Sequence, residues 1–296
     1  MNTLTHLGRV DLARNKVVDS TDVHDALRGL IPLLNDAERK EYFNFHYWRF
    51  AETLKECAHW ANGRILDIGA FPGHMAMVLR RLGCEVHGIT NHEPSGRGRY
   101  GQDQLAARWS EEGIALHYAV IDKEAFPLAN DTFDGALLTE VLEHLVYDPR
   151  PVVQEMHRVL KKNGELVVST PNVTRIENRI KILIGRNVYP REDHFYFSNL
   201  YMRHNREYTL HETINLFCPP FRLKKARYIA PYDFAVPVSD GGHVYDTKEY
   251  AEVVGGRAQG RAPLGLASAA RRMLRWAKFI YPPFRSCLLL SFVAQK

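Results

Sequence analysis

The sequence predicts an α/β fold built on a doubly wound, mostly parallel sheet. Over about 110 residues, short apolar runs alternate with amphipathic segments, a rhythm typical of βαβ units with parallel strands. The first apolar run ends in a glycine-rich turn, and a segment of helical periodicity follows directly. The 296-residue chain is 45% hydrophobic and 25% charged, an ordinary globular composition with enough length for a large core.

The first βαβ unit is the clearest. A buried strand at 65–68 runs into the turn GAFPG at 69–73. Apolar residues recur at helical spacing over 75–82, and a second buried strand follows at 86–89. Glycines let the backbone lie close to a ligand, and the helix N-terminus favours negative charge. The unit therefore predicts a nucleotide-type binding site.

The remaining elements follow in order along the chain. Helices are expected at 21–34, 36–60, 100–112, 140–145, 151–162, 174–184 and 266–280, and from a capping box at 209–212. Strands are expected at 114–121, 133–139, 165–170, 221–229 and 287–294. The helix at 36–60 is rich in aromatic residues, and such a stripe more often packs on a core than lines a pocket.

Composition excludes several classes of protein. No apolar run approaches the roughly 20 residues that span a bilayer, and the first residues lack the apolar stretch of a secretory signal. The four cysteines are scattered, as expected for reduced thiols, so a cytoplasmic protein is predicted. Net charge is +5, and no acidic residue follows Glu252. This basic region is either a solvated helix face or a contact for phosphates, anionic lipid or nucleic acid.

The glycine turn distinguishes between two kinds of cofactor. A dinucleotide fingerprint requires Gly-x-Gly-x-x-Gly and an acidic residue about 20 positions later. Here Phe71 stands at the middle glycine, Gly73 comes one residue early, and Thr90 ends the second strand. A nicotinamide dinucleotide is therefore disfavoured.

The arrangement resembles the class I S-adenosylmethionine-dependent methyltransferases. ILDIGAFPG matches their first motif at Asp67, Gly69 and Gly73, and AVIDKEAFPLANDTFDGALLTEVLEHL and EMHRVLKKNGELVVSTPN resemble their later strands in order. The resemblance implies a Rossmann-like sheet of seven strands with an antiparallel last strand, N-terminal helices and lid insertions. It also implies a helical extension at 1–60 and a methyltransferase domain at 61–296, with insertions at about 173–208 and 231–285.

The same resemblance implies S-adenosyl-L-methionine as the cofactor and assigns its contacts. The family usually has an acidic residue at the Thr90 position for the ribose, so Asn91 or Glu93 is expected to contribute here. Asp122 matches the acid that usually accepts from the adenine amino group. The expected cofactor-binding residues are Asp67, Gly69, Ala70, Phe71, Gly73, Thr90, Asn91, Asp122, Lys123 and Glu140.

A metal site is one hypothesis for the chemistry. Glu140, Glu143 and His144 have i, i+3, i+4 spacing, which places them on one face of a helix. The pattern is similar to that of ubiquinone-pathway O-methyltransferases, where such residues can hold a divalent cation. A bound Mg²⁺ would chelate a diol and lower its pKa. The alternative is that these side chains brace the sheet end without a metal.

A base is the other chemical requirement, because a neutral acceptor oxygen must lose a proton. His144, His194 and His204 are the candidates, although loop histidines are often only solvated. Arg206 either binds an anionic acceptor or is a surface residue. The aromatic cluster at 195–201 either stacks a ring or forms the small core of a lid.

Three functions are compatible with the sequence. The resemblance implies methyl transfer to a small-molecule acceptor, expected to be a hydroxyl of a sugar, glycolipid or secondary metabolite. The alternatives are a nucleic-acid or protein methyltransferase and a non-catalytic binding module of the same fold. The helix at 266–280 carries Met273, Trp276, Ala277 and Ile280 on one face, which predicts peripheral contact with a membrane.

Overall fold

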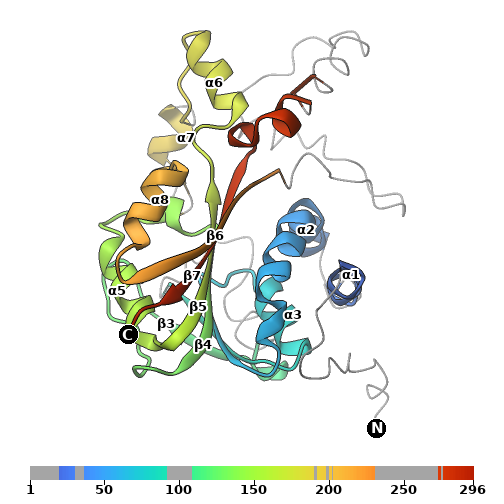
Figure 1. Ribbon diagram of the computed structural model, residues 1–296, viewed down its shortest axis with the longest axis vertical. Coiled ribbons are helices and arrows are strands. Elements are labelled where there is room, and N and C mark those ends of the chain that lie inside the picture. The colour runs from blue at the N-terminus through green and yellow to red at the C-terminus, as the bar shows by residue number, and fades with distance from the viewer. Residues whose placement is uncertain are drawn as a thin grey trace.

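A seven-stranded sheet forms the centre of the computed structural model, which describes residues 20–30, 37–91, 109–189, 192–197, 200–201, 203–230, 273–274 and 276–296 (Figure 1). The strand order is β3-β2-β1-β4-β5-β7-β6. The strands are β1 (Arg64–Ile68), β2 (Glu85–Thr90), β3 (Ala115–Tyr118), β4 (Phe133–Thr139), β5 (Leu160–Pro171), β6 (Phe221–Ile229) and β7 (Cys287–Ala294). The last strand, β7, runs antiparallel to both of its neighbours, β5 and β6, whereas the other pairs in the sheet are parallel, which confirms the predicted topology.

Helices cover both faces of the sheet. On one face lie α1 (Ser20–Arg28), α2 (Ala37–Cys57) and α3 (His74–Arg81), and on the other α5 (Arg150–Val159) and α8 (Leu210–Phe217) (Figure 1). Two further helices, α6 (Ile176–Leu183) and α7 (Glu192–Phe197), stand beyond the carboxyl end of β5. Short 3-10 turns occur at η2 (Ala58–Trp60), η3 (Leu142–His144) and η5 (Pro282–Phe284).

The strands are buried on both faces, and this explains why they are apolar runs in the sequence. In β1, Ile65 packs in the core under α2 and α3, whereas its neighbour Leu66 packs in the core under α5 and α8. In β5, Val167 faces the first core and Leu166 and Val168 face the second. Because successive side chains point to opposite faces, a parallel strand between two helical layers needs apolar residues at every position.

Most predicted elements are confirmed. The segments 221–229 and 287–294 coincide with β6 and β7, and the capping box is formed between Thr209 and Glu212. The predicted helix at 151–162 is too long, because Leu160 leaves the helix to pair with Phe133 of β4. Most of the helices predicted at 100–112 and 266–280 lies outside the described residues.

Two predictions about the chain as a whole can be compared with the structure. All four cysteines are free thiols, and three of them are buried. Within the described ranges, no helix combines the length and apolar character that crossing a bilayer requires.

Candidate active site

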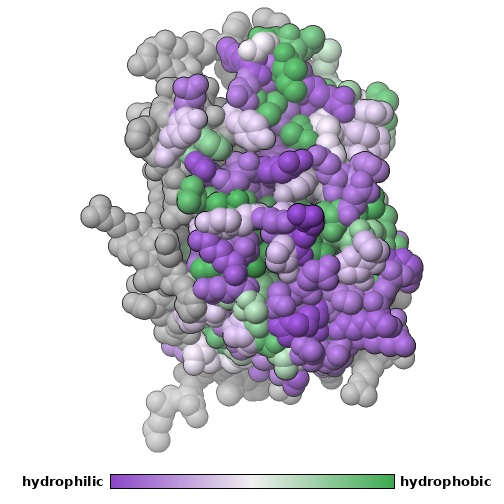
Figure 2. All heavy atoms as spheres, turned by 90° about the vertical axis from the view of Figure 1, so that its left-hand side faces the viewer, coloured by the Kyte–Doolittle hydropathy of each residue, from purple (hydrophilic) through white to green (hydrophobic). Residues whose placement is uncertain are grey.

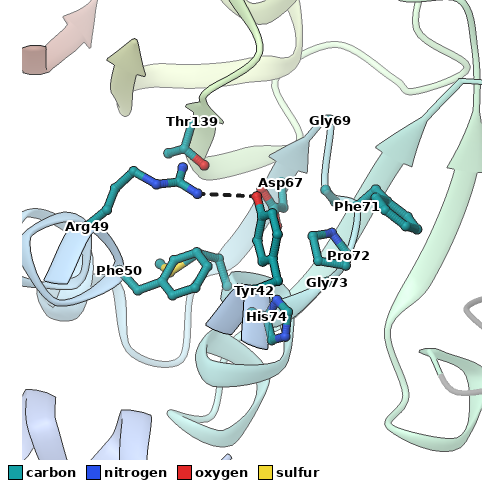
Figure 3. Close-up of a pocket in the computed structure, with 12 residues that line it drawn as sticks. Tyr42, Arg49, Phe50, Asp67, Gly69, Phe71, Pro72, Gly73, His74 and Thr139 are labelled. Atoms are coloured by element: carbon teal, nitrogen blue, oxygen red, sulfur yellow. Dashed lines mark hydrogen bonds between the residues drawn. The ribbon is translucent and has the colours of Figure 1, made fainter. Parts of the chain in front are cut away.

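A pocket lies between α2 and the turn that joins β1 to α3. It contains about 280 Å³ of empty space, part of it open to solvent. Figure 3 shows its lining: side chains of α2 face the turn across Asp67, and Thr139 closes one side from the end of β4. The lining residues are Tyr42, Arg49, Phe50, Asp67, Gly69, Ala70, Phe71, Pro72, Gly73, His74, Met75 and Thr139.

The glycine turn brings the backbone of β1 to the pocket. Gly69 has φ +68°, and a Cβ atom there would lie 2.3 Å from Val141 Cγ2. Gly73 has φ +90°, and a Cβ atom there would lie 2.5 Å from the indole nitrogen of Trp109. Any other residue at these positions would meet both backbone strain and a steric clash. The turn is therefore built for glycine at the two motif positions that the sequence retains.

Asp67 is the buried charge of this pocket. Its side chain is 3% exposed. Burial raises the pKa of Asp67 to about 7, although the Ala76 backbone N–H and the Arg49 guanidinium act in the opposite direction. A carboxylate that is costly to ionise in the free protein gains from a cationic ligand beside it.

Helix α2 supplies groups to the pocket that the sequence did not single out. Arg49 is only 2% exposed and donates a hydrogen bond to the Tyr42 hydroxyl at 3.4 Å (Figure 3). The Tyr42 ring stacks on His74 with centroids 5.6 Å apart, and the Arg49 guanidinium lies 5.1 Å from the Phe50 ring centroid. The feature of the sequence that could have indicated this role is the arginine among the aromatic residues of 36–60. The stripe serves both predicted roles, because Phe43 packs in the core while Tyr42 lines the pocket.

Phe71, which replaces the middle glycine of the motif, lies at the outer edge of the pocket. Its side chain is 36% exposed. In Figure 3 its ring points away from Tyr42 and Asp67. The substitution therefore leaves the space above Asp67 open.

The residues predicted to hold the ribose and adenine follow β2 and β3. Thr90 and Asn91 are half-buried at the end of β2, and the chain from 92 to 108, including Glu93, lies outside the described residues. Asp122 is buried and accepts hydrogen bonds from the backbone N–H groups of Val146 and Tyr147 at 2.8 and 3.1 Å. Its carboxylate therefore holds the chain after β4 in place.

The other polar groups predicted at this edge also have protein partners. The hydroxyl of Tyr201 donates to Asp122 Oδ1 at 3.3 Å. Lys123 lies over the Tyr147 ring, 4.6 Å from its centroid. An adenine amino group bound here would share the Asp122 carboxylate with Tyr201.

A second polar group, which we call the Glu143 cluster, comprises Glu143, His144 and His204. The potential ligand atoms of these three side chains lie within 4.8 Å of one another. Glu143 is 1% exposed, and its Oε2 accepts from the Thr170 hydroxyl at 3.1 Å. The rings of His144 and His204 meet edge to face with centroids 4.9 Å apart. The cluster joins the turn after β4 to the end of β5 and to the 203–208 loop.

Both imidazoles of the Glu143 cluster are oriented by a hydrogen bond. His144 Nδ1 lies 3.0 Å from the Arg203 carbonyl oxygen, and His204 Nδ1 lies 3.0 Å from Glu207 Oε1. Glu207 is in turn paired with Arg175. These contacts place the N–H on Nδ1 and leave Nε2 of each ring as the acceptor nitrogen.

The cluster also separates the proton affinities of its members. Burial, together with the neighbouring Glu140 carboxylate, raises the pKa of Glu143 to about 8. Burial lowers the pKa of His144 to about 4. Burial lowers the pKa of His204 as well, but Glu207 and the nearby Glu143 carboxyl outweigh this effect and raise it. Groups of shifted and unequal pKa in one place are typical of acid–base sites.

The structure does not have the helix on which the predicted metal-ligand set was placed. Glu143 and His144 lie in the 3-10 turn η3, and Glu140 precedes it with φ +56°, so the three residues do not share one helix face. Glu140 Oε1 instead accepts from the Ser169 hydroxyl at 2.9 Å and from the Cys287 thiol at 3.3 Å. His204 takes the third place in the group.

The loop residues predicted to contact the acceptor have mixed outcomes. The side chain of His194 lies outside the described residues. Arg206 is exposed and pairs with Glu212 at 2.7 Å, as the surface interpretation predicts. Phe195 meets the rings of Tyr189 and Tyr196 edge to face and lies under the Arg203 guanidinium at 4.0 Å, an arrangement typical of a small lid core.

Comparisons with known proteins agree with this geometry. Residues 66–168 match the family model of a methyltransferase domain. A ubiquinone biosynthesis O-methyltransferase from Ruegeria sp. (strain TM1040) is 35% identical over 123 residues, which are 42% of this chain and 47% of that protein. A ubiquinone/menaquinone biosynthesis C-methyltransferase from Geotalea daltonii is 29% identical over 153 residues, which are 50% of this chain and 57% of that protein.

The fold is also found in solved structures. An S-adenosylmethionine-dependent methyltransferase from Mesorhizobium loti superposes with a TM-score of 0.50 at 17% identity, over 81% of this chain and 97% of that one. The chain spans about half the length of the curated relatives it matches. The matched segment contains β2 to β4, most of β1 and β5, and the glycine turn. Residues 66–168 thus match a methyltransferase domain, and the chain has the fold of a solved S-adenosylmethionine-dependent methyltransferase.

Proposed function

We propose that this protein transfers the methyl group of S-adenosylmethionine to a hydroxyl group of a small molecule. The observation that carries the proposal is the position of two polar sites at the same edge of the sheet. One is the pocket at the glycine turn, and the other is the Glu143 cluster at the ends of β4 and β5. In doubly wound folds, ligands bind outside the carboxyl ends of the strands.

The pocket carries the charges that the amino-acid end of the cofactor requires. That end has an ammonium group and a carboxylate. Asp67 offers a buried carboxylate for the ammonium, and Arg49 offers a buried guanidinium for the carboxylate. We therefore assign the cofactor's methionine end to the space between α2 and the glycine turn, with the backbone of Gly69 and Gly73 against it. In this assignment α2 belongs to the cofactor site, although it lies in the predicted N-terminal extension.

The two sites are within electrostatic reach of each other. Burial raises the pKa of the Tyr42 phenol; the Arg49 guanidinium acts in the opposite direction, and the carboxyl groups of Glu140 and Glu143 add to the rise. Methyl transfer is an in-line substitution, so holding the acceptor oxygen against the methyl group supplies much of the rate.

His204 is our candidate for the base. Glu207 orients its ring, so Nε2 can take the hydroxyl proton as the oxygen attacks the methyl carbon. The S–CH₃ bond breaks as the C–O bond forms, and its electron pair returns to sulfur. S-adenosylhomocysteine, the methylated acceptor and a protonated imidazole result. The Glu207 carboxylate, which lies 3.0 Å from His204 Nδ1, stabilises the imidazolium.

A magnesium site is not part of this proposal. Mg²⁺ prefers an octahedral set of oxygen ligands, whereas the Glu143 cluster has one carboxylate and two imidazoles. That donor set suits a borderline metal such as zinc better. The hydrogen bonds on both Nδ1 atoms are equally explained by an acid–base role.

The acceptor class is proposed from the relatives. The printed names of several relatives join ubiquinone biosynthesis to O-methylation, which favours an aromatic hydroxyl. None of those named relatives supports the sugar or glycolipid expected from the sequence. The C-methyltransferase relative makes a carbon acceptor the second candidate.

Two measurements test the function. Calorimetry with S-adenosylmethionine and S-adenosylhomocysteine should show binding of both, and binding of neither would leave only the non-catalytic module. Transfer of a labelled methyl group should then be measured to a catechol, a sugar panel and total RNA. Label in the catechol alone is expected. Label in RNA alone would refute the small-molecule assignment in favour of a nucleic-acid methyltransferase.

A further inference from the structure

Exposed apolar side chains are concentrated at one end of this molecule. Of the fourteen large hydrophobic side chains that are exposed among the described residues, twelve belong to 180–200 and 273–281. In Figure 2 the hydrophobic colouring gathers at the upper end, where Figure 1 places α6, above a mostly hydrophilic face. Scattered exposed apolar residues are normal, but a concentration of this kind marks an interaction surface.

Two segments far apart in the sequence form this end together. Lys278, on the helical turn at 276–280, pairs with Glu177 of α6 at 2.6 Å. The guanidinium of Arg179 lies 5.4 Å from the ring centroid of Phe284, and Asn172 Nδ2 donates to the Pro283 carbonyl at 2.9 Å. The two segments are therefore held side by side and present one surface.

The side chains at the tips of both segments point into solvent. On and just after α6, the exposed fractions are 66% for Ile182, 85% for Leu183 and 58% for Ile184. On the C-terminal segment, Phe279 and Ile280 are 72% and 74% exposed. Transfer of each of these side chains from water into an apolar phase is favourable, because it removes apolar surface from water.

The charges on α6 and on the C-terminal segment are mostly basic, whereas Glu192 and Asp193 follow farther along the chain. Glu177 is the only acidic residue in 173–189 and 273–296, and Lys278 neutralises it. Arg179 and Arg186 are exposed, and Lys181 is half-buried beside the apolar tips. The basic side chains attract anionic lipid headgroups, and the apolar tips between them can enter the acyl chains.

The aromatic residues of the surface suit the same partner. Trp276 is 64% exposed and Tyr281 is 49% exposed, both next to the aliphatic tips. Tryptophan and tyrosine are enriched where a membrane meets water, because each has an apolar ring and a polar group.

We infer that 179–186 together with 273–281 is a docking surface for an anionic lipid bilayer. The contact is peripheral, made by the tips of two short segments. The α6 half was not expected from the sequence, which predicted only the 266–280 half. This inference does not rest on the proposed methyl transfer. Because α6 follows β5, a docked bilayer would lie at the same end of the sheet as the Glu143 cluster.

Vesicle flotation of the full chain tests the inference. The protein should float with vesicles of phosphatidylcholine mixed with phosphatidylglycerol, and not with phosphatidylcholine alone. The double variant Leu183→Asp/Phe279→Asp should lose at least about tenfold in partition coefficient, since two large apolar side chains no longer enter the bilayer. Both positions are exposed, so the fold should survive, and circular dichroism checks this.

A control separates local contact from net charge. The control variant Lys162→Asp/Arg222→Asp changes the net charge more than Leu183→Asp/Phe279→Asp does. Its two positions are exposed and lie near the opposite end of the sheet, so this variant should float like the wild type. The inference is overturned if the wild type fails to float or floats equally on neutral vesicles. It is also overturned if the first variant floats unchanged, or if the control loses binding to the same degree.

Discussion

Replacing Asp67 by asparagine should stabilise the free protein and weaken cofactor binding at the same time. Asp67 is 3% exposed, and burial raises its pKa from 3.8 to about 7. At a pH above both values, ionising this carboxyl inside the fold costs about 4 kcal/mol relative to the unfolded chain. Asparagine keeps an acceptor for the Ala76 N–H and removes the charge. Its buried amide donors cost about 1–3 kcal/mol, so a net gain of about 1–3 kcal/mol is expected at pH 8.

The pH dependence gives this prediction its sign. Between pH 4 and 7 the folded protein keeps a proton on Asp67 that the unfolded chain has lost. The contribution of Asp67 to stability is therefore fully present below pH 4 and falls as the pH rises to about 7. The stability advantage of Asp67→Asn should grow over the same interval and stay constant above it.

Urea unfolding at pH 5 and pH 8 measures the advantage, with the exposed Asp148→Asn as the matched control. An equal difference between wild type and Asp67→Asn at both pH values would refute the reasoning. Calorimetry supplies the second half of the test. Loss of one partner of a buried charge pair should weaken S-adenosylmethionine binding at least about 30-fold at pH 8. Unchanged binding would remove Asp67 from the cofactor site.

Further predictions concern the other groups of the site. Arg49→Met should weaken S-adenosylhomocysteine binding by about 100-fold in calorimetry. Arg49→Lys should have an intermediate affinity, because lysine keeps the charge and loses the fork geometry. Equal affinities of the wild type and both variants would exclude the carboxylate contact. His204→Gln should lower kcat by about 10²–10⁴-fold with the cofactor KM unchanged, which is the usual contribution of a general base. Glu207→Gln should give a smaller loss and a shifted pH profile, whereas a KM effect alone would favour a binding role for His204. A metal chelator should leave methyl transfer unchanged, and loss of activity that zinc restores would favour a metal-dependent mechanism over the acid–base one.

The strands and the cofactor turn could be predicted from the sequence because their causes are local. β6 and β7 coincide with the predicted ranges, since each is an apolar or alternating run bounded by turn residues. The positions of Gly69 and Gly73 follow from the φ values that the turn requires. The end of α5 could not be predicted, because a pairing with Phe133 on another strand removes Leu160 from the helix.

The Glu143 cluster shows the limit of spacing arguments. The i, i+3, i+4 interpretation assumes a regular helix from Glu140 onward. The chain instead adopts φ +56° at Glu140 and a 3-10 turn after it, which directs Glu140 to Ser169 and leaves Glu143 and His144 together. His204 joins them from a position 61 residues after Glu143, through contacts of the 203–208 loop with the turn.

The sequence by itself determined the class of fold, the strand–turn–helix unit with Asp67, Gly69 and Gly73, and the resemblance of that unit to a methyltransferase domain. These follow from periodicity and from residues close together in the chain. Only the tertiary structure decided that Arg49 and Asp67 line one pocket, that His204 joins Glu143 and His144, and that α6 shares a surface with the C-terminal segment. These contacts join residues far apart in the chain, and packing of helices and loops against the sheet determines them.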